Sequence, residues 1–328
     1  MKFLMINDEH ELYKVMMGDL FNNEYYEVEE INRVSMPKII RKMHDVHYSR
    51  RVNKFGEFPG KCIWNHWYEL HKYNFDPNEN YVVLFMNGSL RNYYNERYLK
   101  NIRKKHSNVK LALLIFDKSI YYGAKRAIKM RNCFDYVFSF DSEDCEKYGF
   151  LKFYNCFSKP STIGYDNSKK CDAFFIGNAG GRLKILKDTF KHISKFNKNS
   201  KFFITGVDNS DMESIPNVYY NQEMSFYDEM SYSYNSNCLI EILREGQTGI
   251  SLRVCEAIAF NKKLLTNNQN LKKEPFYDSR YMYVFEKPED IPISFFSNND
   301  NNIVRYNDSN VFSPLRICEK ILEMEKDS

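Results

Sequence analysis

The chain has 328 residues, 43% of them hydrophobic and 27% charged, which is the composition of a globular protein large enough for two domains. This composition excludes wholesale disorder. The formal net charge is only +4, which gives no reason to expect a nucleic-acid partner. The first residues, MKFLMINDEHELYK, are too acidic for a secretory signal, and no run of 18 apolar residues follows. Eight scattered cysteines indicate reduced thiols rather than disulfides or a metal site, so we expect a cytoplasmic protein.

Apolar runs typical of strands alternate with helical patterns through the first half of the chain. Parallel sheets with crossover helices produce this alternation, so we predict an α/β domain. The predicted strands are 2–6, 81–86, 110–116 and 135–140. The predicted helices lie near 9–21, 36–54, 62–73, 91–106 and 119–131.

The basic residues of the first half are concentrated between Arg33 and Lys61. Eight basic residues stand there against two acids, Asp45 and Glu57. A solvated helix face accounts for such a run, and so does a patch that binds an anionic lipid or a phosphorylated acceptor. Both interpretations stay open, and the second makes peripheral contact with an anionic membrane a hypothesis to test.

A stretch without an apolar period, FSKPSTIGYDNSKK at 157–170, is typical of a linker, and the α/β pattern restarts after it. Strands are predicted at 171–177, 201–206, 218–220, 237–242, 263–268 and 281–285, with helices near 181–196 and 224–232. We therefore expect an N-terminal domain at 1–160, a C-terminal domain at 171–312 and a last helix at 313–328 that packs back toward the first domain. Two doubly wound domains would place the carboxyl ends of their strands at a shared cleft.

The stretch GQTGISLRVCEAIAFNKKLLTNN, residues 246–268, has the pattern of a turn, a helix and a strand. Gly249 lies in the turn, and Ser251 is placed to cap the helix, whose first amides suit a phosphate. Arg253 and Glu256 share one face of that helix at a spacing of i to i+3. They either pair with each other on the helix surface or bind a nucleotide, the guanidinium a phosphate and the carboxylate two ribose hydroxyls.

A second glycine-containing loop follows the first strand of the second half. In FFIGNAGGRLKIL, residues 174–186, Asn178, Gly181 and Arg182 stand between a strand and a helix. The loop lacks the GxGxxG pattern, so it is either a phosphate loop or a plain glycine-rich connection. Its position after the first strand opens it toward the same cleft.

Residues 237–268 resemble the donor-binding segment of GT-B glycosyltransferases, in particular bacterial enzymes of capsule, exopolysaccharide and lipopolysaccharide assembly. The shared features are a Gly-Gln-x-Gly turn, a Ser/Thr-Leu-Arg helix start, a Glu-Ala pair and a lysine-led strand that ends in Thr-Asn. FDYVFSFDSEDCEKYGF, residues 134–150, is similar to a segment near the end of their N-terminal domain. The resemblance implies a GT-B fold, with two Rossmann-like domains facing a central cleft, and a nucleotide-sugar donor.

The resemblance also implies roles for single residues. Glu256 matches the acid that binds the donor ribose, while Ser251 and Arg253 match positions beside the diphosphate, where Arg182 would supply a second positive charge. The other donor-binding candidates are the loop residues Asn178, Gly181 and Gly249. Retaining enzymes of the wider group have another Glu eight residues before the last acid, and Thr248 stands there, so retention and inversion both stay open.

The chain contains no Asp-x-Asp motif, through which the metal-dependent alternative fold binds its nucleotide sugar. We therefore expect no metal and no cofactor, with helix amides and arginines neutralising the leaving diphosphate. If the enzyme inverts the sugar carbon, a carboxylate or imidazole should take the proton of the acceptor hydroxyl. The positional candidates, in order of preference, are His10, Glu9 and Asp117, which follow predicted strands of the first domain.

These features favour a glycosyltransferase of the hexosyltransferase class that moves a sugar from a nucleotide diphosphate, expected to be UDP, to a growing cell-surface glycan. The acceptor would be a glycan or a lipid-linked glycan, met at the inner face of the membrane. Two alternatives share the donor site: a sugar-nucleotide epimerase of the same architecture, and a binding module that has lost transfer. A signalling receiver domain is disfavoured, because Asn87 stands where that fold needs its phospho-acceptor Asp.

Overall fold

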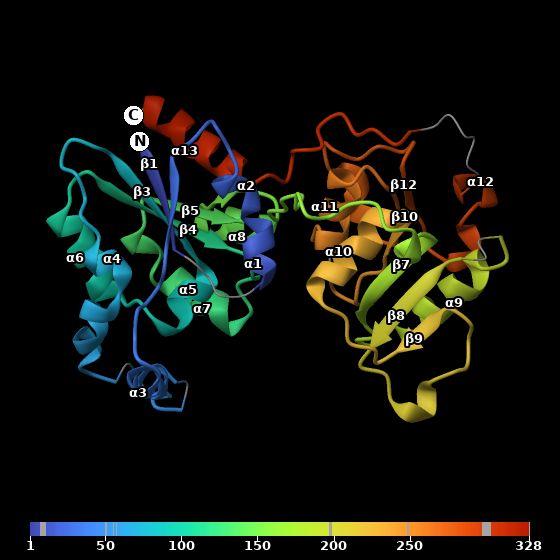
Figure 1. Ribbon diagram of the computed structural model, residues 1–328, viewed down its shortest axis with the longest axis horizontal. Coiled ribbons are helices and arrows are strands. Elements are labelled where there is room, and N and C mark those ends of the chain that lie inside the picture. The colour runs from blue at the N-terminus through green and yellow to red at the C-terminus, as the bar shows by residue number, and fades with distance from the viewer. Residues whose placement is uncertain are drawn as a thin grey trace. The chain divides into compact units, whose positions relative to one another are not determined.

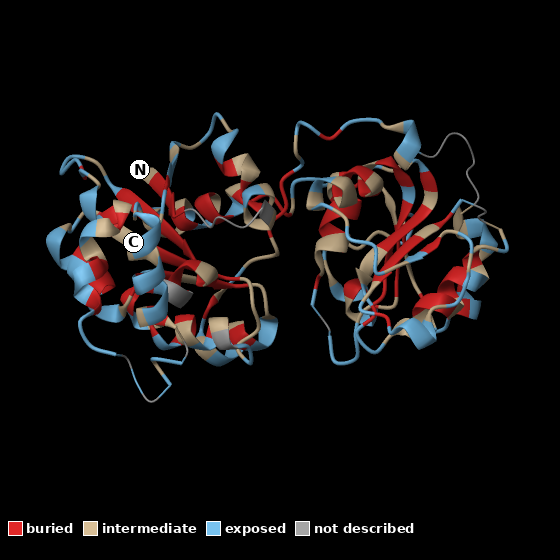
Figure 2. Ribbon diagram, turned by 60° about the horizontal axis from the view of Figure 1, so that its bottom comes forward, coloured by how far each residue is buried: buried red, intermediate tan, exposed pale blue. Residues whose placement is uncertain are grey.

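The computed structural model describes residues 1–6, 11–49, 51–54, 56, 58–196, 199–247, 249–296 and 303–327. The chain divides into two compact units (Figure 1). Unit 1 comprises Met1–Tyr154 together with Pro314–Ser328, and unit 2 comprises Asn155–Ser313. In each unit a parallel sheet of largely buried strands lies among helices whose outer faces are exposed (Figure 2).

The sheet of unit 1 has six parallel strands in the order β2-β1-β3-β4-β5-β6. The strands are β1 Lys2–Ile6, β2 Val28–Ile31, β3 Tyr81–Met86, β4 Val109–Ile115, β5 Tyr136–Ser139 and β6 Leu151–Lys152. All six residues of β3 are buried, as expected for an apolar run in a central strand covered on both faces. The strand order reverses between β1 and β3, and ligands of doubly wound folds bind at the carboxyl ends of such a pair.

The four strands predicted for the first half are present, and β2 and β6 are additional. Both lie at an edge of the sheet. The sequence of β2 is VEEI, and its two glutamates are exposed, so it carries no apolar run. β6 is only two residues long. Hydrophobic patterning misses these two strands because the first has no apolar run and the second is too short to show one.

Polar side chains mark the ends of two helices in unit 1. α6, Glu96–Lys105, begins where the Asn95 side chain accepts a hydrogen bond from the Tyr98 amide at 2.9 Å. α3, Lys38–Tyr48, ends before the predicted residue 54, and the Asn53 amide donates to the carbonyls of His47 and Ser49 at 2.7 and 2.9 Å. The other helices of the first 154 residues are α1 Glu11–Met16, α2 Gly18–Phe21, η1 Lys61–Trp67, α4 Glu69–Lys72, α5 Asn87–Asn92, α7 Tyr122–Lys129, η2 Arg131–Cys133 and α8 Ser142–Tyr148.

The last helix, α13 Leu315–Lys326, belongs to unit 1. It buries Ile317, Cys318 and Ile321, and Lys110 of β4 donates to both carboxylate oxygens of Glu325 at 2.6 and 2.7 Å. The chain therefore returns to its first unit after it has completed the second. Within the described ranges, no helix has the length and apolar character needed to cross a membrane.

The sheet of unit 2 also has six parallel strands, in the order β12-β11-β10-β7-β8-β9. The strands are β7 Cys171–Asn178, β8 Lys201–Thr205, β9 Val218–Tyr220, β10 Ser236–Glu241, β11 Lys263–Thr266 and β12 Met282–Val284. The helices are η3 Asn167–Lys169, α9 Leu183–Ile193, η4 Asn209–Asp211, α10 Phe226–Asn235, α11 Leu252–Ala259, η5 Gln269–Lys273, η6 Pro288–Asp290 and α12 Ile293–Phe296. The strand order reverses between β7 and β10, which makes their carboxyl ends the switch point of this unit.

Residues 157–170, interpreted from the sequence as a linker, pack within unit 2. The Phe157 amide donates to the Phe312 carbonyl at 2.8 Å, and the Phe157 ring meets Phe260 edge to face. Ile163 is only 6% exposed. The apolar residues of this stretch are spaced too irregularly to show a period, yet they are buried in unit 2. The first unit ends at Tyr154 rather than at residue 160.

Candidate functional site

The switch point of unit 2 brings together the two loops that stand out in the sequence. β7 ends at Asn178, and the loop continues through Gly180 and Gly181, whose φ angles are 48° and 82°. β10 ends at Glu241, and its loop runs to the start of α11 at Leu252. Because β7 and β10 are hydrogen-bonded neighbours, both loops leave the same edge of the sheet side by side.

The side chain of Asn178 lies against the turn that follows β8. Gly206 has a φ of 67°, which strains residues other than glycine, and a Cβ atom there would also displace the side-chain amide of Asn178. On the other side, Nη2 of Arg182 donates to the Asn178 carbonyl at 3.0 Å. These contacts fix both the loop after β7 and the start of α9.

Two guanidinium groups, those of Arg182 and Arg244, converge on the loop that follows β7. A Cβ atom on Gly180 would stand 2.5 Å from Nε of Arg244, so this side chain lies directly against the glycine backbone. Burial, and then the positive charge of Arg244, lower the pKa of Arg182 to about 10. Among the residues that the structure describes, no carboxylate forms an ion pair with either group. Two positive charges held together in this way favour an anionic ligand.

Sequence reasoning does not find Arg244. It stands just before the glycine-rich turn and matches no motif. Its place in the site comes from the approach of the β7 loop, where Gly180 leaves room for the guanidinium. Only the pairing of two strands distant in sequence creates that contact.

A buried carboxyl group, that of Glu241, joins three elements beneath the loops. Glu241 is 4% exposed and accepts hydrogen bonds from the hydroxyls of Ser251 and, at 2.5 Å, Thr266. Burial raises the pKa of Glu241, and the two hydroxyls and the charges of Arg253 and Arg182 oppose that rise. The ends of β10 and β11 and the start of α11 are thereby tied together. The only sequence signal is an acid at the end of an otherwise apolar strand.

Ser251 caps α11, as predicted from the sequence. Its hydroxyl oxygen accepts a hydrogen bond from the Arg253 amide at 3.1 Å while its proton is donated to Glu241. The Gly249 carbonyl accepts a hydrogen bond from the Asn268 side chain at 3.2 Å. The turn before the helix is thus anchored to the segment after β11. Thr248 lies outside the described residues.

Arg253 and Glu256 form an ion pair with each other, but the pair is not on the helix surface. The side chains of Arg253 and Glu256 are 13% and 3% exposed, and Ser233 of α10 bonds to both, at 2.6 Å in each case. Burial raises the pKa of Glu256, opposed by the charge of Arg253 and by both hydrogen bonds. Ser233 and Arg253 both donate to Oε2 of Glu256, and Oε1 of Glu256 accepts no hydrogen bond from the described residues. The roles of these two residues in donor binding stay predictions.

In unit 1, Asp117 follows β4 at the carboxyl edge of the sheet. Its Oδ2 atom accepts a hydrogen bond from the side-chain amide of Asn87 at 2.8 Å. Asn87 is 1% exposed, and its Oδ1 accepts from the Phe116 amide at 3.0 Å, which fixes its orientation. Asn87, the residue that disfavours a receiver domain, thus holds Asp117 in place. His10 and Glu9, the other candidates for the base, lie outside the described residues.

Within the described part of the chain, no group of three or more His, Cys, Asp or Glu side chains is placed to hold a metal ion. At the switch point of unit 2, the guanidiniums of Arg182 and Arg244 and the helix start at Ser251 lie above the buried carboxyl of Glu241, which two hydroxyls already satisfy. An anion with two adjacent negative groups fits such an arrangement better than a cation does.

Comparison with known proteins addresses the fold. No family model and no curated protein matches the chain. Solved structures do match over its full length. They include a UDP-GlcNAc 2-epimerase from Methanocaldococcus jannaschii, 8% identical with a TM-score of 0.50, over 100% of both chains. An α,α-trehalose-phosphate synthase (UDP-forming) from Burkholderia vietnamiensis is 8% identical with a TM-score of 0.52, over 100% of this chain and 99% of that one.

A third similar structure is that of HepE from Anabaena in complex with UDP-glucose, 9% identical with a TM-score of 0.50, over 100% of both chains. The fold is GT-B. Both α/β units of the GT-B chain carry six parallel strands, of which the sequence predicts four in unit 1 and six in unit 2. The structural similarity over the full length establishes the architecture. Because the sequence identities are only 8 and 9%, the reaction has to be inferred from the side chains.

Proposed function

We propose that this GT-B chain is a metal-independent glycosyltransferase that takes a sugar from a nucleotide diphosphate and transfers it to a cell-surface glycan. The observation that carries the proposal is the convergence of Arg182 and Arg244 at the switch point of unit 2. One guanidinium group can donate two hydrogen bonds to two oxygens of a phosphate. The charges of two guanidinium groups match those of a diphosphate. The amides at the start of α11 add the positive end of a helix dipole.

The remaining donor-site residues have defined parts in this proposal. Oε1 of Glu256 is the carboxylate oxygen left to accept a ribose hydroxyl, because Oε2 is occupied by Ser233 and Arg253. Arg253 is held by Glu256 and Ser233 and adds positive charge near the helix start. Uridine is the proposed nucleoside of the donor because the similar structures are named for UDP, UDP-glucose or UDP-GlcNAc.

The step that these groups would assist is departure of the nucleoside diphosphate. As the bond between the sugar carbon and the diphosphate oxygen breaks, negative charge grows on the diphosphate, and fixed guanidiniums stabilise it more than they stabilise the bound donor. This accounts for transfer without a divalent ion, in line with the lack of an Asp-x-Asp motif. Activity should therefore withstand EDTA, whereas loss in EDTA and recovery with Mn²⁺ would contradict the metal-independent mechanism.

Asp117 is the described candidate for the base. If the sugar carbon is inverted, its carboxylate would take the proton of the attacking acceptor hydroxyl, and Asn87 would orient it through Oδ2. His10 and Glu9 remain candidates from the sequence. The acceptor is proposed to be a glycan or lipid-linked glycan reached from the cytoplasmic side of the membrane.

A nucleotide-sugar screen tests the proposal. Ligands that bind only the folded chain raise the midpoint of thermal unfolding, and a donor at a hundred times its Kd adds about 2.7 kcal/mol. Replacing Arg244→Ala should weaken binding of the stabilising nucleotide sugar roughly 10- to 100-fold, because hydrogen bonds to charged groups contribute about 1.5–3 kcal/mol. Arg305→Ala removes an exposed arginine elsewhere in unit 2 and is the matched control. Equal affinity in both variants would refute the diphosphate assignment.

An epimerase is the second candidate, because the full-length similarity includes a UDP-GlcNAc 2-epimerase. The two reactions differ in what they need. An epimerase alters the nucleotide sugar alone, whereas a transferase releases nucleoside diphosphate only when an acceptor is present. Chromatography of the nucleotide sugar after incubation without acceptor therefore separates them. A module that binds the donor and does neither would give thermal stabilisation without any product.

A further inference from the structure

The outer face of α3 exposes an apolar stripe that the core does not use. Ile39, Met43 and Val46 are 75%, 57% and 62% exposed, and their spacing of i, i+4 and i+7 places them in one line along the helix. Phe58, 54% exposed, extends the stripe, because its ring lies 5.3 Å from that of His47 near the end of α3. Exposed apolar residues scattered singly are ordinary, but a contiguous line on one helix marks an interaction surface.

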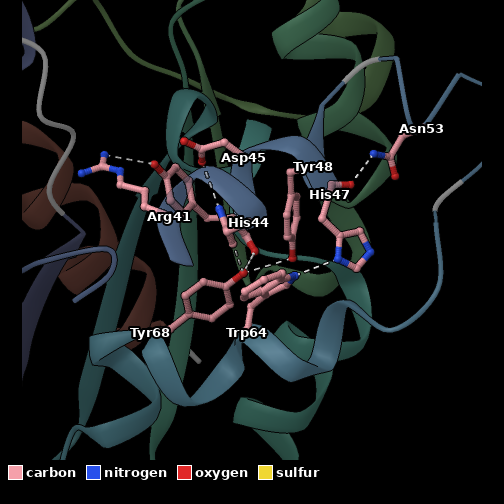
Figure 3. A network of polar contacts seen from close by, with 9 residues as sticks. Arg41, His44, Asp45, His47, Tyr48, Asn53, Trp64 and Tyr68 are labelled. Atoms are coloured by element: carbon pink, nitrogen blue, oxygen red, sulfur yellow. Dashed lines mark hydrogen bonds and ion pairs between the residues drawn. The ribbon is translucent and has the colours of Figure 1, made fainter. Parts of the chain in front are cut away.

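The inner face of the same helix is firmly attached to unit 1, so the stripe is not the result of a loosely placed element. His44 is fully buried, and its ring stacks on Tyr48 at 4.6 Å and meets Trp64 edge to face at 5.4 Å (Figure 3). The hydroxyls of Tyr48 and Tyr68 are 3.1 Å apart, and His44 Nε2 lies 3.4 Å from the Tyr68 hydroxyl. Burial lowers the pKa of His44, which keeps the ring neutral in this apolar setting.

The segment after α3 is held to the helix by a second set of bonds. The Trp64 indole donates to Nδ1 of His47 at 2.9 Å (Figure 3). Nε2 of His47 lies 3.0 Å from the Pro59 carbonyl. Asn53 bridges the helix end to Lys61, whose ammonium donates to Oδ1 at 2.8 Å. These bonds link the end of α3 to Asn53, Pro59, Lys61 and Trp64, and the apolar stripe lies on the opposite, exposed face of the helix.

Exposed basic side chains adjoin the stripe, and one exposed acid, Asp45, lies on α3 with them. Lys38 and Lys42 are exposed on α3, and Arg51 is exposed in the turn that Asn53 ties to the helix. Asp45 is the acid of α3, and its carboxylate lies 3.1 Å from the buried ring of His44. An apolar line flanked by basic side chains on a convex helix face is the arrangement that lies in the interface of an anionic bilayer.

We propose that this surface, consisting of Ile39, Met43, Val46 and Phe58 with Lys38, Lys42 and Arg51, docks unit 1 on an anionic lipid bilayer. A second copy of the chain is a poor occupant, because a two-fold interface would set this positive surface against itself. A bilayer supplies both the negative charge and the apolar depth that the surface needs. The apolar side chains enter the boundary between headgroups and acyl chains, and the basic ones contact the headgroups.

The surface lies at the carboxyl edge of the unit 1 sheet, where Asp117 stands. Tyr48 of α3 lies under the guanidinium of Arg126, 5.8 Å away, and Arg126 belongs to α7, the helix that follows β4 and Asp117. His44 stacks on Tyr93 at 5.1 Å, just after α5, which begins at Asn87. Docking would therefore bring this edge toward the lipid phase. That consequence, delivery of a lipid-linked acceptor, rests on the proposed function, whereas docking itself does not.

The test is sedimentation of the full-length chain with vesicles of phosphatidylcholine, alone or with about a third phosphatidylglycerol. We expect binding to the anionic vesicles that weakens as salt is raised from about 0.1 M to 1 M, since the Debye length falls from about 10 Å to 3 Å. The double variant Ile39→Gln/Met43→Gln should lower the partition constant at least about tenfold. Lys38→Gln/Lys42→Gln should lower it about fivefold for each lysine removed.

Matched controls remove similar side chains elsewhere. Ile293→Gln/Ile303→Gln deletes two apolar residues of 62% and 71% exposure in unit 2, and Lys104→Gln/Lys105→Gln deletes two exposed lysines at the end of α6. Both should bind within about twofold of the wild type, because their charges and apolar groups lie outside the docking surface.

Three results would overturn the proposal: no binding to anionic vesicles, wild-type binding by Ile39→Gln/Met43→Gln, or a dimer in sedimentation equilibrium that this variant abolishes. Either of the first two results would indicate that the surface binds a protein partner, and the third would indicate that it binds a second copy of the chain. The assay contains no nucleotide sugar, so its failure leaves the proposed transfer reaction standing. Failure of the donor screen, conversely, would leave vesicle binding unaffected.

Discussion

At the scale of single residues, Glu241 shows how burial makes stability depend on pH. Its pKa is raised above the usual 4.5 by burial, so the folded chain keeps this proton at a pH where the unfolded chain has released it. The stabilisation from Glu241 is therefore complete below about pH 4.5 and is lost as pH rises through the raised pKa. Each unit of that rise corresponds to about 1.4 kcal/mol.

Glu241→Gln should remove this dependence, because the amide is neutral at every pH and keeps hydrogen-bonding atoms near Ser251 and Thr266. The free energy of unfolding of Glu241→Gln, measured in urea, should improve relative to wild type as pH rises from 4.5 to 8. Glu245→Gln replaces an exposed carboxylate in the next turn and should stay within about 0.5 kcal/mol of wild type throughout. A difference between Glu241→Gln and wild type that is constant over this range would contradict the raised pKa.

Gly180 and Gly181 offer a matched pair for the anion site. Both have positive φ, so alanine strains the backbone at either position by about 1 kcal/mol. Only at Gly180 would the added Cβ displace the Arg244 guanidinium, since nothing lies within 4 Å of a Cβ at Gly181. Gly180→Ala should therefore weaken nucleotide-sugar binding at least about tenfold more than Gly181→Ala, as read by titration calorimetry. Equal affinities would remove Arg244 from the donor site.

The sequence predicts local features of this site better than those that depend on packing. The cap at Ser251 and the shared face of Arg253 and Glu256 follow from helix periodicity, which acts over a few residues. The burial of that pair, and its bonds to Ser233, require α10 to pack against α11. Arg244 belongs to the site because it contacts Gly180, some 60 residues earlier in the chain. The spacing of residues along the sequence does not predict that contact.

At the scale of elements, the start of α11 carries more than an ordinary helix cap. Ser251→Ala removes the acceptor for the Arg253 amide and also the hydroxyl that satisfies Glu241. Ser225→Ala removes the matching cap of α10, whose hydroxyl accepts from the Asp228 amide at 3.1 Å and donates to an exposed carboxylate. Loss of a cap costs about 1 kcal/mol, and leaving a buried acceptor unsatisfied costs about 1–3 kcal/mol more. Urea unfolding should thus show a larger loss for Ser251→Ala, and equal losses would mean that water replaces the hydroxyl at Glu241.

Element boundaries follow the same division between local and distant causes. β3 and β4 are continuous apolar runs and are found by pattern alone, while β2 and β6 are recognisable only by the strands they pair with. The predicted helix at 36–54 keeps its period past residue 48, yet α3 stops at Tyr48. The side chain of Asn53 folds back onto the last carbonyls there, and periodicity does not detect such a stop.

At the scale of the molecule, the recurrence of the α/β pattern predicts two sheets, and the strand pairings confirm two sets of six parallel strands. What the pattern leaves open is which segments complete each unit. Residues 155–170 belong to unit 2 because scattered apolar side chains such as Phe157 and Ile163 are buried there. α13 belongs to unit 1 through the burial of Ile317, Cys318 and Ile321 and the ion pair of Lys110 with Glu325.

The place of α13 leads to a prediction about how the chain loses structure. Ile321 is fully buried, so Ile321→Ala should destabilise unit 1 by about 2–5 kcal/mol through lost contacts and the cavity left behind. Hydrogen exchange read by mass spectrometry should accelerate in β1 and β4 while peptides from β7 and β10 keep their protection, because each unit has its own core. Glu323→Ala, on the exposed side of α13 beside Lys320, should change exchange little, since surface ion pairs contribute about 0–1 kcal/mol. Faster exchange in β7 and β10 of Ile321→Ala as well would show that the two units unfold as one.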